Sequence, residues 1–270
     1  MKNLIVIADY CADSLTTQEL RSAAMGRLSI PLTSQISFIH STPSTIHTSF
    51  LVQQILLTEA RLGNANNLVI FANTDPRLQT IKGVKLAKGA DFIVAKMKNG
   101  AWVCGPNAGH SFSLIREDIQ YLYLYPNLNR GTQFRSRELY MRIAALLMEE
   151  KQDEMDLEEI RNNDIPVLND FYIGHIDNYG NMKTTIPNSF MKGKYNYEQK
   201  IKINLNKQTK EVIYTDNMFG QTPGVLVLSP GSSGMPTDPY LELAIWQHYP
   251  DSSALKAFPQ AKPGDEIKVK

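Results

Sequence analysis

Cysteine is scarce in this sequence, and long apolar runs and net charge are lacking. The two cysteines, Cys11 and Cys104, form no spacing motif, which indicates a reducing compartment. No segment reaches the apolar length of a membrane span, and Asp9 ends the first apolar run before it could form a signal-peptide core. A formal net charge of +1 gives no overall field that would recruit nucleic acid or an anionic membrane. We therefore expect a cytoplasmic protein with neither nucleic acid nor a membrane as partner.

Several motifs of familiar nucleotide and catalytic sites are also missing. No GxGxxG follows a predicted strand, and the sequence has no Walker loop and no nucleophile-elbow serine. None of the five histidines pairs with another at the spacing of metal ligands. We therefore expect no metal site and no bound cofactor.

The chain is long enough for two domains, and its pattern of apolar, polar and turn residues changes at about residue 165. It has 270 residues, of which 43% are hydrophobic and 20% charged, as in an ordinary globular protein. In residues 1–164, apolar runs at 4–8 and 68–72 flank an amphipathic helical pattern at 46–62. This rhythm predicts an α/β N-terminal domain with a mixed, mostly parallel sheet between helices. Residues 165–270 show period-two alternation and many turn residues, which predicts a smaller, mostly β C-terminal domain.

Four local expectations complete the outline of the chain. Residues 134–148 have the pattern of a helix with one apolar face. Residues 149–164 are strongly acidic and are expected to form a solvated helix tail and interdomain connector. Residues 229–234 predict a loop of small residues, and residues 240–248 predict a short helix.

Asp9 is the first candidate for a functional site, because it follows the first predicted strand. In an open sheet, a polar group where a parallel strand ends and a helix begins lies on the ligand-binding edge. The same carboxylate could equally cap the turn that follows.

A second candidate is the segment 174–186, which contains Asp177, Tyr179, Gly180 and Asn181. The carboxylate can hold a cation or a hydroxyl group, the amide can donate and accept hydrogen bonds, and the ring offers a flat face. These groups suit a purine nucleoside or an amino-acid zwitterion. They equally suit a plain β-hairpin turn with polar tips.

A third candidate is the pair Ser232 and Ser233, which lies between glycines. Hydroxyls and exposed backbone N–H groups could bind a carboxylate there, or the segment could be a plain loop.

The order of these features along almost the whole chain carries a resemblance. Asp9 follows the first strand, Asp75-Pro76 follows a central strand, and four more motifs come later, namely Gly-Pro-Asn-Ala-Gly (105–109), Phe-Arg-Ser-Arg-Glu (134–138), His-Ile-Asp-Asn-Tyr-Gly-Asn (175–181), and Gly-Ser-Ser-Gly (231–234) ahead of Tyr-Leu-Glu-Leu-Ala (240–244). The series resembles the S-adenosylmethionine hydroxide adenosyltransferase family, which also contains fluorinating and chlorinating enzymes. The resemblance implies an α/β N-terminal domain and a β-barrel-like C-terminal domain. It also implies a homotrimer that holds its ligand between the N-domain of one subunit and the C-domain of the next.

The resemblance further implies that S-adenosylmethionine is the substrate, and it assigns binding residues. Asp9 would bind the ribose hydroxyls, Asp177 the methionine ammonium and Asn181 the adenine, with Tyr179 in the same binding segment. Ser232 and Ser233 would bind the methionine carboxylate. Two features depart from the family pattern: an insertion at 235–238, and Trp246 where a small polar residue is usual.

The implied reaction is hydrolysis, in which water or hydroxide attacks C5′ of the ribose to give adenosine and methionine. The hydrolases that this chain resembles share a set of three residues around that water: an Asp, an Arg and a His. Asp75 matches the Asp, Lys82 or Arg77 falls at the Arg, and Arg135 stands at the His. Ser136 stands where hydrolases carry glycine and the fluorinating enzymes carry serine.

The departures leave alternatives to hydrolysis open. A carboxylate at Asp75 would repel a halide, which argues against halogenation. The set around Asp75 could orient hydroxide, or it could be an inert ion pair that blocks the pocket. The other interpretations are a non-catalytic protein that binds S-adenosylmethionine or adenosine, and a descendant that has kept only an interaction role.

Overall fold

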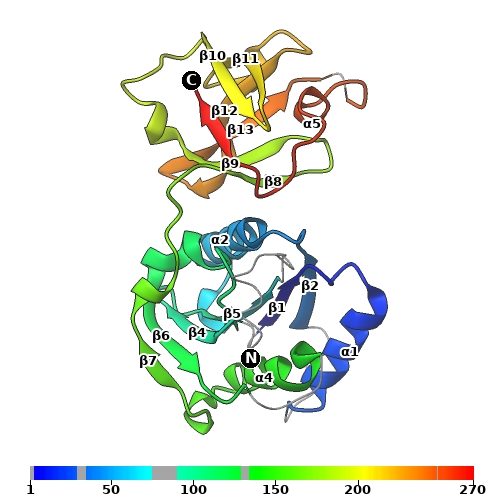
Figure 1. Cartoon of the computed structure of the whole chain (residues 1–270), viewed down its shortest axis with the longest axis vertical. Helices are drawn as coiled ribbons and strands as arrows, with labels where there is room; N and C mark the ends of the chain where they lie inside the picture. Colours follow the sequence, from blue (N-terminus) through cyan, green and yellow to red (C-terminus); the bar gives the residue numbers. More distant parts are fainter. Residues whose placement is uncertain (1–2, 29–34, 75–89, 129–133, 248) are drawn as a thin grey trace. The chain divides into compact units, whose positions relative to one another are not determined.

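The structure is a computed structural model, and it describes residues 3–28, 35–74, 90–128, 134–247 and 249–270 (Figure 1). The chain divides into two compact units, Met1–Val167 and Leu168–Lys270. Within the described ranges, no helix is both long enough and apolar enough to cross a membrane.

The N-terminal unit contains one seven-stranded sheet and three α-helices in its described part. The strands are β1 (Asn3–Ala8), β2 (Ile36–His40), β3 (Leu68–Asn73), β4 (Phe92–Met97), β5 (Trp102–Pro106), β6 (Ile119–Tyr125) and β7 (Glu158–Ile160). The helices are α1 (Ser14–Met25), α2 (Thr45–Leu62) and α4 (Met141–Met148). Short 3₁₀ turns are η2 (Ala65–Asn67), η3 (Ser113–Asp118), η5 (Gln152–Glu154) and η6 (Asn162–Asp164), and η4 (Ser136–Tyr140) is a π-helical turn.

The expectation of an α/β domain with a mostly parallel sheet is wrong. The strand order is β2-β1-β3-β5-β4-β6-β7, and only β2, β1, β3 and β5 run parallel. The pairs β5–β4, β4–β6 and β6–β7 are antiparallel. The physical reason is the tight turn at Asn99-Gly100, which joins β4 directly to β5, because a hairpin reverses the strand direction whereas a helical crossover preserves it. The sheet is therefore mixed, and its other half is antiparallel.

Two apolar layers cover the two faces of this sheet. Successive strand residues point to opposite faces, so Val6 packs in one layer and Ile7 in the other. The first layer receives α1 and α4 through residues such as Leu20 and Leu147, and the second receives α2 through Val52. Figure 1 shows α1 and α4 on one side of the strands and α2 on the other. This packing fixes the strand ends that carry the candidate site.

The acidic segment 149–164 is not the solvated helix tail and connector that the sequence predicts. It contains β7, which pairs with β6, and Met155 and Ile160 pack against the two apolar layers. An edge strand keeps one side exposed, so it can carry glutamates without burying their charge.

The C-terminal unit is built on a second seven-stranded sheet, with the order β14-β10-β11-β12-β13-β9-β8. Its strands are β8 (Ile173–Ile176), β9 (Met182–Pro187), β10 (Gln199–Leu205), β11 (Gln208–Tyr214), β12 (Leu226–Met235), β13 (Asp238–Ile245) and β14 (Ile267–Val269). Its helical elements are α5 (Ala254–Ala257) and the 3₁₀ turns η7 (Asn188–Met191) and η8 (Met218–Gly220).

This second sheet nearly closes into a barrel. All of its pairings are antiparallel except β11–β12. The chain beside β8 also contacts the chain beside β14 through a bridge between Tyr172 and Glu266. Ile173 N–H donates to the carbonyl of Asp265 at 2.9 Å. The enclosed core includes Met182, Leu243 and other buried apolar residues.

Two local expectations in this unit are wrong. Residues 240–248 do not form a helix, because Tyr240 to Ile245 belong to β13, which is paired with β9 and β12. Residues 229–234 do not form a loop, because they lie in β12, whose pairing with β13 shifts register between Pro230 and Gly234. Hydrogen bonding on both sides of β13 outweighs the helix propensity of its leucines, glutamate and alanine.

Candidate functional site

The parallel strands of the N-terminal sheet end together, and buried hydroxyl groups join their carboxyl ends. Ser41 follows β2 and Thr74 follows β3, and their side-chain oxygens lie 3.0 Å apart. Thr48 of α2 donates from Oγ1 to Ser41 Oγ at 3.2 Å, and its Oγ1 lies 2.5 Å from that of Thr74. All three residues are buried. These contacts hold the strand ends and the start of α2 in one rigid edge.

A second polar cluster, formed by Tyr10, Asn73 and Ser136, lies beside the ends of β1 and β3. The Asn73 amide nitrogen donates to Ser136 Oγ at 2.7 Å and to Tyr10 Oη at 3.2 Å. Phe134 packs edge-on against the Tyr10 ring, with 5.7 Å between ring centroids. Burial raises the pKa of Tyr10 well above its usual range, although hydrogen bonds with Ser136 and Asn73 act to lower it. Tyr10 is therefore a neutral phenol at physiological pH.

The predicted helix at 134–148 begins with the π-helical turn η4 before it continues as α4. Such single π turns occur frequently at functional sites. The turn places Ser136 in the interior with 4% of its surface exposed, while the half-buried Arg135 precedes it. Arg137 turns outward and pairs with Glu19 at 2.8 Å and with Glu138 at 3.0 Å. The turn thus separates an inward serine from an ion pair on its outer side.

The predicted catalytic residues and the predicted binding residue Asp9 fall into two groups. Ser136 lies in the polar cluster, and Arg135 is its neighbour in the chain. Asp9 directly follows β1, is half-buried and precedes Tyr10 of the cluster. Asp75 and Arg77 lie outside the described residues, as does Lys82.

The segment 105–109, part of the resemblance, begins at the end of β5 and continues into a loop, and its first glycine has a structural reason. A Cβ atom on Gly105 would lie 1.9 Å from the carbonyl oxygen of Ala72 in β3. The loop is also fixed to the start of α2, because His110 N–H donates to Thr45 Oγ1 at 3.1 Å. Gly105 therefore permits the close approach of β5 to β3.

In the C-terminal unit, Asp177 and Asn181 close the turn between β8 and β9. Asp177 Oδ1 accepts hydrogen bonds from Tyr179 N–H at 2.9 Å and from Asn181 N–H at 3.0 Å. Its Oδ2 accepts from the Asn181 amide at 3.0 Å. Gly180 has a φ of +76° and donates to the Asp177 carbonyl at 2.9 Å. The hairpin-turn interpretation of this segment is confirmed, and the carboxylate is oriented by its own loop.

Tyr179 stands at the tip of this turn, with 63% of its surface exposed. Its ring packs edge-on against Tyr249, which is 58% exposed, with 5.3 Å between centroids. Gly180 lies against the first turn of α5, because Leu255 N–H donates to its carbonyl at 2.9 Å. The turn therefore presents its exposed ring beside a second exposed ring, that of Tyr249, which comes from the segment between β13 and α5.

Ser232 and Ser233 lie on β12 and have opposite environments. Ser232 is exposed, and its Oγ accepts from Lys183 Nζ at 3.1 Å. The same ammonium pairs with Glu242 at 3.0 Å. Ser233 is only 3% exposed, and its hydroxyl has no hydrogen-bond partner among the described residues. The ammonium of Lys183 therefore sits beside the accessible serine.

Metal ligands are not grouped in the described part of the chain. No set of three or more histidine, cysteine, aspartate or glutamate residues there could hold a metal ion. Burial raises the pKa of Cys11 to about 11, so its thiol is protonated at neutral pH.

We expect His175 to make the protein less stable at acid pH. Burial and then the charge of Lys183 lower the pKa of His175, while Asp177 acts to raise it. Because the folded pKa lies below the unfolded value, the unfolded chain binds more protons, and stability falls as the pH drops below about 6.5. Urea unfolding near neutral pH and near pH 5 should show a smaller loss for His175→Gln than for the unmodified protein. The matched control is His40→Gln, at an exposed position, and an unchanged loss in His175→Gln contradicts the prediction.

We expect Ser136→Ala to destabilise the N-terminal unit by about 1–3 kcal/mol, because the half-buried Asn73 amide then loses its shorter hydrogen bond. Urea denaturation measures the change. Ser37→Ala, on the exposed face of β2, is the control and should stay within about 0.5 kcal/mol. Equal effects of the two changes would rule out an energetic role for the cluster.

The sequence singled out Ser136, but it did not indicate its partners. Asn73 ends the apolar strand β3, and Tyr10 comes two positions after the end of β1. That position at a strand end was the one signal that could have identified them. Lys183 could have been found from its place on β9, opposite Glu242 of β13. Nothing in the sequence distinguishes the buried hydroxyl residues Ser41, Thr48 and Thr74 from ordinary cap and turn residues.

Comparisons with known proteins show the fold and nothing more specific. No family model matches the chain, and no curated protein matches it. An uncharacterized conserved protein from Thermotoga maritima has a similar structure, with a TM-score of 0.71 and 17% identity over 99% of this chain and 100% of that one. A conserved hypothetical protein from Thermus thermophilus matches with a TM-score of 0.65 and 15% identity over 100% of both chains. At these identities, the chain shares its fold with two proteins of undescribed activity.

Proposed function

We propose that this protein cleaves S-adenosylmethionine by hydrolysis. Water or hydroxide attacks C5′ of the ribose, and the bond between C5′ and sulfur breaks with its electron pair passing to sulfur. Methionine leaves as a neutral thioether, and the attacking oxygen loses its proton to give adenosine. The sulfonium is already a good leaving group, so the protein's main tasks are to align the nucleophile and strip its water.

The observation that carries this proposal is the convergence at the edge of the N-terminal sheet. Ser136 and Asn73 are 63 residues apart in the chain, and the 2.7 Å bond between them joins the Phe-Arg-Ser-Arg-Glu segment to the end of the strand that precedes Asp75-Pro76. Tyr10 joins Asp9 to the same cluster, and Asp75 follows Asn73 by two positions in the sequence. A polar cluster at the carboxyl ends of parallel strands is where such sheets bind ligands.

In this proposal, the groups of the C-terminal unit bind the methionine and adenine parts. The Asp177 carboxylate accepts three hydrogen bonds from its own turn and, with about four acceptor sites, keeps capacity for an ammonium group. Tyr179 offers an exposed ring for adenine, alongside the Asn181 amide. The exposed Ser232, next to the Lys183 ammonium, suits a carboxylate better than the buried Ser233 does.

Assembly and location are further parts of the proposal and follow the same resemblance. We propose a cytoplasmic homotrimer that binds S-adenosylmethionine between adjacent subunits. Light scattering of the purified protein tests the number of subunits, and a monomeric mass would contradict this part alone.

A second candidate function is binding of S-adenosylmethionine or adenosine without turnover. Arg135 favours it, because this arginine stands where family hydrolases carry histidine, and a fixed positive charge cannot act as a base. An arginine that pairs with Asp75 would also occupy the place of the attacking water.

Incubation with S-adenosylmethionine followed by chromatography separates the two functions. The proposal predicts adenosine and methionine in equal amounts, above a control without protein. If adenosine stays at the control level while calorimetry detects binding of S-adenosylmethionine or adenosine, the second function holds. If neither turnover nor binding is detected, both functions are excluded.

A further inference from the structure

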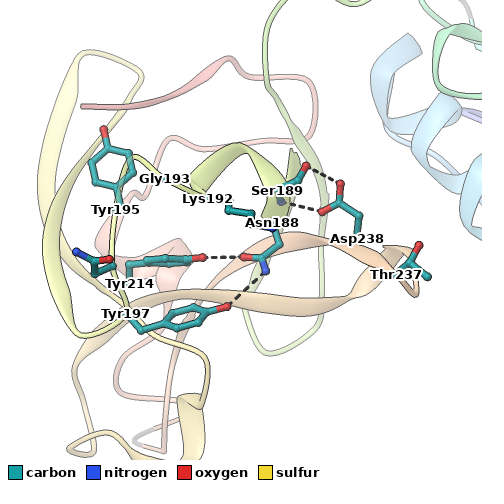
Figure 2. Close-up of a pocket in the computed structure, with 10 residues that line it drawn as sticks. Asn188, Ser189, Lys192, Gly193, Tyr195, Tyr197, Tyr214, Thr237 and Asp238 are labelled. Atoms are coloured by element: carbon teal, nitrogen blue, oxygen red, sulfur yellow. Dashed lines mark hydrogen bonds between the residues drawn. The ribbon is translucent and has the colours of Figure 1, made fainter.

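The C-terminal unit contains a pocket of about 520 Å³ that the proposed reaction does not use. It lies between the turn η7, the loop that follows it, β11, and the turn from β12 to β13. Figure 2 shows the phenol rings of Tyr197 and Tyr214 on one side and Asp238 on the other. None of Asp177, Asn181, Ser232 and Ser233 lines it.

Hydrogen bonds within its wall hold one side of the pocket in place. Tyr214 Oη donates to Asn188 Oδ1 at 2.8 Å, and the Asn188 amide nitrogen donates to Tyr197 Oη at 3.4 Å. The rings of Tyr197 and Tyr214 pack together, with centroids 4.7 Å apart and planes tilted by 34°. Burial raises the pKa of Tyr214 far above its usual range, and its hydrogen bond with Tyr197 raises it further, so Tyr214 stays a neutral donor. Tyr214 is only 4% exposed and supports the Tyr197 ring, so Tyr197 provides the accessible aromatic surface of the pocket.

The other side of the pocket is a fixed carboxylate. Ser189 donates its backbone N–H to Asp238 Oδ1 at 2.8 Å and its hydroxyl to Oδ2 at 2.6 Å. A carboxylate accepts about four hydrogen bonds, so Asp238 keeps acceptor capacity for a ligand. The exposed Thr237 hydroxyl and the Lys192 ammonium add groups that can donate.

The composition of this lining decides the class of ligand. Of the described residues that line the pocket, none has an aliphatic side chain, which disfavours an apolar ligand. One ammonium and one carboxylate leave no net charge to select an anion or a cation. Donors and acceptors surround an aromatic surface that is partly accessible, since Tyr197 is 42% exposed. A ring with hydroxyl groups at its edge and C–H groups on its face matches all three features.

We propose that this pocket binds a neutral cyclic polyol, such as a pyranose sugar. Its C–H face lies on the ring of Tyr197, and its hydroxyl groups bond with Asp238, Asn188 and Thr237. The proposal is independent of S-adenosylmethionine cleavage, because it uses none of the residues assigned to that reaction.

Calorimetric titration of the full chain with methyl glucoside, methyl galactoside and methyl mannoside tests the proposal, with adenosine as a fourth probe. We expect at least one glycoside to bind with a dissociation constant of about a millimolar or less. Tyr197→Ala should weaken this binding about tenfold, because it removes the accessible ring. Thr237→Val removes one hydroxyl at an exposed turn and should also weaken glycoside binding. If Tyr197→Ala unfolds the unit, the Thr237→Val variant tests the proposal instead.

The matched control is Tyr121→Ala, at an exposed tyrosine of β6 in the N-terminal unit, which should bind the glycoside unchanged. Three results would each overturn the proposal. One is the absence of heat with every glycoside, and another is binding that neither Tyr197→Ala nor Thr237→Val weakens. The third is binding of adenosine, in place of a glycoside, that Tyr197→Ala abolishes.

Discussion

Asp75→Asn is expected to reduce adenosine formation from S-adenosylmethionine by about a hundred- to ten-thousand-fold. In the proposed reaction, the carboxylate at this position orients the attacking water and favours its loss of a proton. Asparagine keeps the size and one oxygen acceptor, but it loses the charge. The affinity for S-adenosylmethionine should change little, because the binding groups proposed for the substrate are elsewhere in the chain.

Turnover assays and calorimetry on the same preparation separate these two effects. The control is Asp153→Asn, which removes an exposed carboxylate in the turn η5 and should leave both rate and affinity unchanged. Full turnover in Asp75→Asn would show that the residue has another role. Loss of affinity together with turnover would place Asp75 among the binding groups.

Gly105→Ala is expected to destabilise the N-terminal unit by about 4 kcal/mol or more. The new Cβ would lie 1.9 Å from the carbonyl oxygen and 3.0 Å from the carbonyl carbon of Ala72. Both are backbone atoms in the centre of the sheet, so no side-chain rotation can relieve the clash. The parallel pairing between β3 and β5 must therefore separate, and with it the position of Asn73.

Thermal and urea unfolding measure the effect, with Gly26→Ala as the control. Gly26 ends α1 with a φ of −67°, and a Cβ there would lie 3.3 Å from the Ser22 carbonyl oxygen. Alanine should change stability there by about 1 kcal/mol or less. Similar stabilities of the two variants would show that β3 and β5 are not as close as described.

The elements that local patterns determine were predicted well. The continuous apolar runs became β1 and β3, and the amphipathic pattern became α2. The direction of the remaining strands was not determined locally. β6 and β7 pair antiparallel because of how distant segments meet, so the mostly parallel sheet was a wrong extrapolation from the first strands.

The helix predicted at 240–248 failed for a related reason. Leu241 and Leu243 are buried and Glu242 between them is less so, which is the alternation of a strand. The helix propensities of leucine, glutamate and alanine favoured the other interpretation, and pairing with β9 and β12 decides the outcome.

The candidate site was predictable only where it follows directly from chain order. Asp9 and Ser136 were singled out from the sequence, but the bond between Asn73 and Ser136 depends on the packing of α4 onto β3. Asp177 shows a different limit. The residues around Asp177 suited both a turn and a binding segment. The structure shows the turn, but its hydrogen bonds do not use all the acceptor capacity of the Asp177 carboxylate.

Mass spectrometry of the product formed in heavy-oxygen water tests the central claim most directly. If water attacks C5′ of S-adenosylmethionine, the 5′ hydroxyl of the adenosine carries the heavy oxygen, and methionine forms in equal amount without it. Absence of adenosine, or release of 5′-methylthioadenosine alone, would contradict the claim, because that product arises when a different bond to sulfur breaks.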